Sequence, residues 1–223
     1  MNKRLVLFVS LLFVFGLMIS MQNVFAQSGD GFVTKHVYKG WNLLGNGEDF
    51  PRPLMDKAQY ILGYAPIVNK YFKIKPESPE EREKFQNEIK SVWPGGDLNK
   101  YEKYVRGSYW FYYPEAGDVS YRVGNIQKEL FSMLAGWNFK YITWDMVGKN
   151  FNDITGNCNV KKAYTYDALK AEEGYTPWES LLGFYFDSQK GKDAVGHGMI
   201  INVEKDCQFS LKDTTPIIPQ LPN

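Results

Sequence analysis

The chain has 223 residues, with 26 basic and 25 acidic side chains and an aromatic content of 16%. This balanced charge excludes the strongly basic surface that neutralises phosphates in nucleic-acid-binding proteins, so we expect no nucleic-acid partner. The length allows one large domain or two small ones. The many Tyr and Phe residues are typical both of strands and of extracellular recognition surfaces.

The first 26 residues have the pattern of a secretory signal peptide. Residues 2–4 contain two basic side chains, and residues 5–19 form an apolar stretch interrupted only by Ser10 and Gly16. Val24-Phe25-Ala26 matches a signal-peptidase site, so we expect cleavage after Ala26. An uncleaved membrane anchor is the alternative, because residues 21–26 extend the apolar stretch toward the ~20 residues of a membrane span. Either interpretation places the chain from Gln27 onward outside the cytoplasm.

The following part of the chain is predicted to be rich in strands. Alternation of apolar and polar residues, or dense Ile, Val, Tyr and Phe, marks each expected strand. The strand at 108–113 is expected to form a hairpin with the strand at 119–123. Pro51 and Pro53 are expected to keep their segment irregular. The expected strands are residues 32–38, 59–64, 67–74, 108–113 and 119–123.

A helix is predicted as an insertion over about residues 79–93. Ser78 is the expected N-cap, Pro79 occupies the first helical position, and Glu81 follows three residues after the cap. Apolar residues at 85, 89, 92 and 93 then lie on one helical face. Asp97 is the expected cap of a further short helical turn that reaches residue 105.

The chain beyond residue 125 is predicted to repeat this plan. Gly40-Trp41-Asn42 recurs as Gly136-Trp137-Asn138, and the late strand that contains Trp110 is matched to the strand that contains Met199. Such duplication indicates two modules, at 27–125 and 126–211, followed by a disordered Pro-rich tail at 212–223. Strands are expected at 139–144, 159–166, 182–186 and 198–203, with a helical turn at 151–154 and loop at 167–177.

Both halves resemble the Gly-Trp-Asn β-repeat modules of exported, archaeal-type prokaryotic cell-surface proteins. In the first half the resemblance is carried by Gly40-Trp41-Asn42-Leu43-Leu44-Gly45 and by the later Gly107-Ser108-Tyr109-Trp110. In the second half it is carried by residues 135–139, 145–149, 153–158, 178, 196–199 and 206–207. The resemblance implies a non-catalytic part of a cell-surface or secreted protein, and it implies no ligand and no active site.

The two cysteines, Cys158 and Cys207, are expected to form a disulfide, because an even cysteine count in an exported chain favours one. Two alternatives remain. Cys158 and His197 are the residue types of a Cys–His nucleophile pair, although Cys158 precedes a strand rather than opening a helix. The two cysteines with His197 provide only three zinc ligands. We therefore expect no cofactor and no metal site.

The tryptophans divide into expected core residues and candidates for ligand binding. Trp41, Trp110, Trp137 and Met199 are predicted to lie in the core, where a Trp side chain buries a large area. Trp144 and Trp178 lie at a strand end and in a polar loop, so they are better candidates for an exposed ring than Trp41 and Trp137. With His197, they are the candidates for ligand binding.

The sequence therefore predicts a mainly β protein of two tandem, sandwich-like or barrel-like antiparallel modules with a helical insertion in the first. The expected function is non-catalytic: an exported cell-surface or extracellular protein with a structural, adhesion or assembly role. Glycan binding through exposed Trp and Tyr is one alternative, and a Cys–His cell-wall hydrolase is another. The expected partner is a cell-envelope protein or polysaccharide, with membrane contact only through an uncleaved N-terminal segment.

Overall fold

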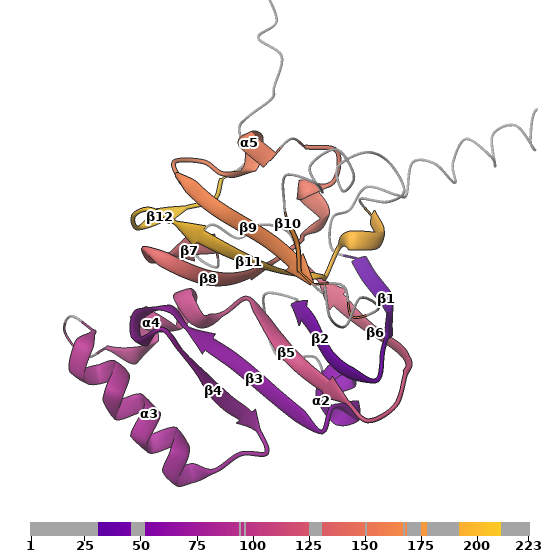
Figure 1. Cartoon of the computed structure of the whole chain (residues 1–223), viewed down its shortest axis with the longest axis horizontal. Coiled ribbons are helices and arrows are strands. Elements are labelled where there is room, and N and C mark those ends of the chain that lie inside the picture. Colours follow the sequence, from indigo (N-terminus) through magenta and orange to yellow (C-terminus); the bar gives the residue numbers. More distant parts are fainter. Residues whose placement is uncertain are drawn as a thin grey trace, which may run out of the picture.

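The structure, a computed structural model, describes residues 31–45, 52–93, 95, 97–124, 131–149, 151–166, 168, 175–177 and 192–210. It is mainly β, with several small antiparallel sheets and few helices (Figure 1). The expected signal peptide, the strand at 182–186 and the Pro-rich tail lie outside the described residues. The strands are β1 Gly31–Val37, β2 Gly40–Gly45, β3 Tyr60–Ala65, β4 Lys70–Lys75, β5 Ser108–Tyr113, β6 Gly117–Val123, β7 Ser132–Met133, β8 Gly136–Tyr141, β9 Val160–Tyr166, β10 Tyr175–Pro177, β11 Gly198–Val203 and β12 Cys207–Gln208. The helices are α2 Arg52–Lys57, α3 Pro79–Val92, α4 Leu98–Val105 and α5 Phe151–Ile154, with 3-10 turns η1 Pro66–Val68 and η3 Trp144–Met146.

The two halves repeat one sheet topology. The four-stranded sheet of the first module has the order β2-β5-β3-β4, and that of the second module has the order β8-β11-β9-β10. Every neighbouring pair in both sheets is antiparallel. The described strands form open sheets and do not close into a barrel. β10 occupies part of the segment where loop was expected, because pairing with β9 orders it as an edge strand.

Each module is organised around two long strands that bend at a corner. β1 continues into β2, and β5 continues into β6. On one side of the corner β1 pairs with β6, and on the other side β2 pairs with β5. The register changes by one residue at the corner, where two residues on one strand face three on the other. The second module has the same arrangement in β7–β8 and β11–β12. The predicted hairpin of 108–113 with 119–123 is therefore wrong: the two segments are successive parts of one bent strand.

The strand register also corrects the alignment of the two modules. Leu43 lies opposite Trp110 in the first sheet, and Phe139 lies opposite Ile200 in the second. Because Leu43 and Phe139 each follow a Gly-Trp-Asn motif directly, Trp110 corresponds to Ile200. The predicted match of Trp110 with Met199 is off by one residue, which places the two side chains on opposite faces of their sheets.

The helices follow their local signals with one exception. The Ser78 hydroxyl accepts a hydrogen bond from the Glu81 N–H at 3.3 Å, as expected for the cap of α3. Asp97 accepts from the Asn99 N–H at 3.0 Å at the start of α4. The segment after Pro51, expected to be irregular, forms α2 instead, because Pro53 lies in the first turn, where a helix does not need its N–H. In Figure 1, α3 lies on the outside of the first module next to β4.

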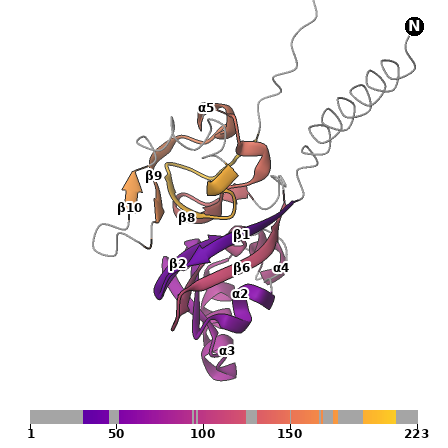
Figure 2. The same cartoon turned by 90° about the vertical axis from the view of Figure 1, so that its right-hand side faces the viewer.

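The two modules share their hydrophobic cores. The largest cluster contains Val33, Phe111 and Tyr121 from the first module together with Met133 and Tyr141 from the second. A smaller cluster contains Leu43, Tyr64 and Trp110 from the first module together with Phe139 and Ile200 from the second. Figure 2 shows the modules stacked one upon the other, with the bent ribbon of β1 and β6 facing the viewer. Because buried residues of both modules belong to the same clusters, we expect the modules to unfold together.

The backbones of the two modules also meet directly. The Gly45 N–H donates to the Gly196 carbonyl oxygen at 3.0 Å, and Leu44 forms an isolated antiparallel bridge with His197. A Cβ atom on Gly107 would lie 2.0 Å from the Phe139 carbonyl oxygen, far inside any real contact. Glycine is therefore required at position 107 for the modules to approach this closely.

A buried lysine connects the second module to the helical insertion of the first. Lys140 is 0% exposed, and its Nζ donates to the carbonyl oxygens of Lys103 at 3.4 Å and Arg106 at 3.2 Å, at the end of α4. A cation at this end of a helix is stabilised by the partial negative charge of the terminal carbonyls. Burial nevertheless lowers the pKa of Lys140 to about 7.

The predicted pairing of Cys158 with Cys207 is confirmed, since their sulfur atoms lie 2.19 Å apart, at disulfide distance. Such a pair is compatible with a protein outside the cytoplasm. None of the helices in the described part of the chain is long and apolar enough to cross a membrane.

Candidate functional site

The Gly-Trp-Asn motif builds the corner of each module. The Asn42 side chain accepts from the Tyr38 N–H at 3.0 Å and donates to the carbonyl oxygens of Tyr38 at 2.8 Å and Gly40 at 3.1 Å. Gly40 has a φ of 104°, which favours glycine. The motif is therefore a backbone clamp, and it fixes where the intervening tryptophan lies.

The second motif repeats this geometry closely. Asn138 accepts from the Leu134 N–H at 3.0 Å and donates to the carbonyl oxygens of Leu134 at 2.7 Å and Gly136 at 3.0 Å. Gly136 has a φ of 97°. Two motifs with the same three hydrogen bonds and the same backbone conformation show that Gly-Trp-Asn serves folding, as its duplication in the sequence indicates.

The clamp in the first module places Trp41 in a row of aromatic side chains at the solvent-facing end of the sheet. Trp41 on β2 lies opposite Tyr112 on β5, and Tyr112 lies opposite Tyr60 on β3. The ring centroids of Trp41 and Tyr112 are 5.3 Å apart, and those of Tyr60 and Tyr112 are 5.8 Å apart. Trp41 is 36% exposed and Tyr60 is 42% exposed. We call Trp41, Tyr112 and Tyr60 the aromatic row.

The aromatic row is the open end of a face that is otherwise buried. Side chains two residues along on the same three strands, Leu43, Trp110 and Leu62, belong to or pack against the smaller core cluster that the second module covers. Because side chains on a strand alternate between faces, these residues and the row share one side of the sheet. The sheet is long enough for one end to be covered by the second module while the other end reaches solvent.

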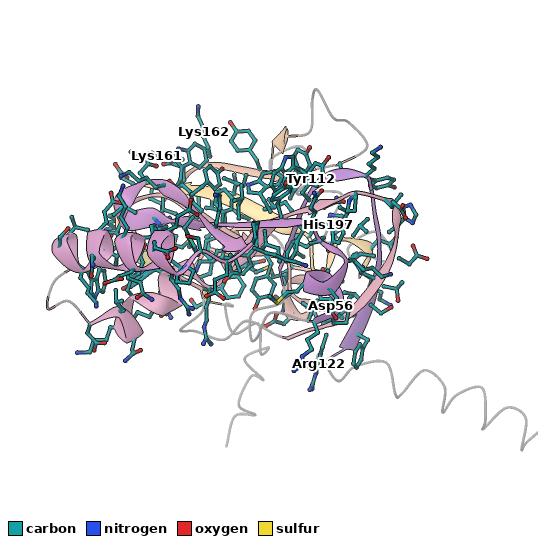
Figure 3. All side chains as sticks on the ribbon, turned by 90° about the horizontal axis from the view of Figure 1, so that it is seen from below. Asp56, Tyr112, Arg122, Lys161, Lys162 and His197 are labelled. Atoms are coloured by element: carbon teal, nitrogen blue, oxygen red, sulfur yellow. A yellow bond between two sulfur atoms is a disulfide. The ribbon has the colours of Figure 1, made fainter. Side chains whose placement is uncertain are left out.

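The equivalent positions of the second module are mostly polar. Trp137 lies opposite Asn202, and Asn202 lies opposite Lys162, so Asn and Lys occupy the places of Tyr112 and Tyr60. Lys162 is exposed, and Trp137 is partly buried. In Figure 3, Tyr112 lies toward the same side of the molecule as Lys161 and Lys162, whereas Asp56 and Arg122 lie toward the opposite side. In the described part of the chain, a continuous aromatic row is therefore found only in the first module.

The residues predicted for the core divide into two groups. Trp110 and Met199 are buried, as expected. The prediction that Trp41 is a core anchor is wrong, because its ring lies at the end of the sheet that the second module does not cover. Trp137, also expected in the core, is only partly buried and contacts the Tyr164 ring at a centroid distance of 6.1 Å.

The predicted surface tryptophans do not form a binding platform in the described part of the chain. Trp144 is partly buried against the main core, and its indole N–H donates to the Gly31 carbonyl oxygen at 3.3 Å. Trp144 is therefore not the exposed ring for which it was a candidate, because the start of β1 covers it. Trp178 lies outside the described residues.

His197 lies at the junction between the modules. Its N–H donates to the Ala194 carbonyl oxygen at 2.9 Å, and its own carbonyl accepts from the Ile142 N–H at 2.9 Å. Burial, together with the nearby positive charge of Lys35, lowers the pKa of His197 to about 3. Burial also lowers the pKa of Lys35 to about 8, although Asp193 opposes this shift. His197 is therefore neutral at physiological pH and belongs to the contact between the modules.

The Cys–His nucleophile pair and the zinc site both require a free Cys158 thiol, and Cys158 is instead paired with Cys207. Among the residues that the structure describes, no group of three His, Cys, Asp or Glu side chains is placed to hold a metal ion. The described residues that stand out as a site are those of the aromatic row.

Sequence reasoning missed Tyr60 and Tyr112. Both lie in segments correctly predicted as strands, but their exposure depends on which end of the sheet the second module covers. A strand-by-strand alignment of the two modules is the signal that finds them, since it sets Tyr60 and Tyr112 against Lys162 and Asn202. Residues that serve only the fold are expected to recur in both modules, whereas these do not.

Comparison of the whole chain with protein-family models, with curated proteins and with solved structures finds no match.

Proposed function

We propose that this is an exported, non-catalytic cell-surface or extracellular protein with an adhesion or assembly role, and that the aromatic row is its binding surface. The row carries the proposal: three aromatic side chains in contact, two of them at least one-third exposed, on three neighbouring strands of a sheet. Trp and Tyr are enriched in protein interfaces, where they provide a large contact area for little lost side-chain entropy. The pattern of the first 26 residues and the resemblance to Gly-Trp-Asn surface modules support the location.

The test is capture of cell-envelope components by the purified protein, comparing wild type with the double variant Trp41→Ala/Tyr112→Ala. We expect the wild-type protein to retain a specific envelope component and the variant to lose most of it. Phe32→Ala is the matched control, because Phe32 is 75% exposed and lies on β1, away from the row. Equal capture by the wild type and the double variant would remove the row from the function.

Glycan binding is the second candidate, because exposed Trp41 and Tyr60 rings are the kind on which sugars stack. Assembly ranks above it because the neighbouring rings are steeply tilted, by 72° for Trp41 on Tyr112 and by 66° for Tyr60 on Tyr112, and so form no flat platform. Protease treatment of the envelope fraction separates the two candidates. Capture that survives complete proteolysis identifies a polysaccharide as the partner.

A further inference from the structure

The proline-rich segment, residues 212–223, has a regularity that the proposed function does not use. Its prolines, Pro216, Pro219 and Pro222, recur every third residue. A polyproline II helix has three residues per turn, so this spacing favours that conformation with all three prolines along one edge. From Thr214 to Asn223 the segment has no charged side chain, so it can lie against aromatic rings without burying a charge.

The aromatic row has dimensions that match this spacing. The centroid distances of 5.3 Å and 5.8 Å place the rings of Trp41 and Tyr60 no more than about 11 Å apart across Tyr112. Successive prolines of the segment are separated by roughly 9 Å in a polyproline II helix, at about 3.1 Å per residue. Two prolines of one segment can therefore contact the row on either side of Tyr112.

The tilt of the rings also suits this kind of ligand. Tyr112 stands at 72° to Trp41 and at 66° to Tyr60, so neighbouring rings alternate between presenting a face and an edge. Proline-rich segments are bound by surfaces lined with aromatic side chains, and their preformed helix loses little conformational entropy on binding. The Asn42 clamp fixes the backbone of Tyr38 and Gly40 next to Trp41, which keeps the row in place before binding.

We propose that the aromatic row of one molecule binds the proline-rich segment of a second molecule. The segment follows Ser210, whose N–H donates to the Ile154 carbonyl oxygen at 3.2 Å in the second module, whereas the row belongs to the first module. Figure 1 shows the second module, with α5, at one end of the molecule and β3 and β5 at the other. A contact between two different surfaces leaves each pair of molecules with one free row and one free segment, so further molecules can add and build open chains or closed rings. This inference rests on the proposed assembly role and names the partner.

The first experiment titrates a synthetic peptide of residues 212–223 into the purified protein in a calorimeter. We expect saturable binding to wild type, at least tenfold weaker binding to Trp41→Ala, and unchanged binding to Phe32→Ala. A peptide with all three prolines replaced by alanine is expected to bind at least tenfold more weakly. Urea unfolding of each variant checks that the fold is intact. Absence of peptide binding to the folded wild-type protein overturns the proposal.

The second experiment measures association by sedimentation velocity over a range of protein concentrations. We expect wild type to form larger species as the concentration rises, while Trp41→Ala and a variant lacking 212–223 each remain monomeric. Mixed together, these two variants are expected to form a one-to-one complex, because one supplies the segment and the other supplies the row. A wild-type protein that binds the peptide but remains monomeric at every concentration refutes binding between molecules and indicates that each segment folds back on its own row.

The envelope-capture experiment separates failure of this inference from failure of the proposed function. If the variant lacking 212–223 still retains the envelope component and Trp41→Ala does not, the row binds a different partner. The proposed function then survives and the proline-rich segment is not its ligand.

Discussion

Asn138→Ala tests the interpretation of Gly-Trp-Asn as a folding clamp. Asn138 is 0% exposed, and alanine removes its three hydrogen bonds to the backbone of Leu134 and Gly136. One N–H and two carbonyl groups then lose their partner in a place where water has little access. At about 1.5 kcal/mol for each group, the free energy of unfolding falls by roughly 4.5 kcal/mol.

The matched change Asn42→Ala breaks the same three bonds in the first module. These bonds are only partly buried, so water replaces part of the loss and we expect a smaller effect, about 2 kcal/mol. Asn99→Ala is the control, because Asn99 is exposed on α4 and alanine is a good helix former.

Urea unfolding of the oxidised protein, followed by tryptophan fluorescence and by far-UV circular dichroism, measures all three variants. We expect one transition by both probes, because the two modules share their cores. A loss below about 1 kcal/mol for Asn138→Ala, or a loss no larger than that of Asn99→Ala, would refute the clamp.

Three further predictions concern the disulfide of the second module and two contacts that join the modules. The Cys158–Cys207 pair closes a loop of 49 residues, so its reduction is expected to lower the free energy of unfolding by ~4 kcal/mol in chemical denaturation. Both modules are expected to lose this stability in one transition, and a loss confined to the second module would contradict the shared core. The pKa of Lys140 is 10.5 in the unfolded chain and about 7 in the folded protein, so between these pH values the unfolded chain holds one more proton. The free energy of unfolding of wild type therefore rises from pH 7 to pH 10 by up to about 4 kcal/mol relative to that of Lys140→Met. Urea titration of both proteins at each pH measures this difference. Gly107→Ala drives a Cβ into a carbonyl of the second module and lowers the melting temperature sharply, whereas Gly117→Ala, with nothing within 4 Å of its new Cβ, shifts it little.

The features predicted correctly from the sequence are those with a local physical cause. Alternating apolar residues mark most of the strands, and the Ser78 cap followed by Pro79 marks the start of α3. The duplicated Gly-Trp-Asn motif indicates the repeated plan because each copy makes its three hydrogen bonds within four residues along the chain. The disulfide follows from there being two cysteines in a chain with a signal-peptide pattern.

The tertiary structure decided which strands pair and which rings are exposed. β5 and β6 look like a hairpin locally, yet each pairs with a different part of the distant β1–β2 strand, which no short window of sequence contains. The exposure of Trp41 and Tyr60, and the burial of Trp144, depend on where the second module and β1 lie. The aromatic row exists only because three strands far apart in sequence lie side by side, and the second module, which covers the rest of that face, leaves this end in contact with solvent.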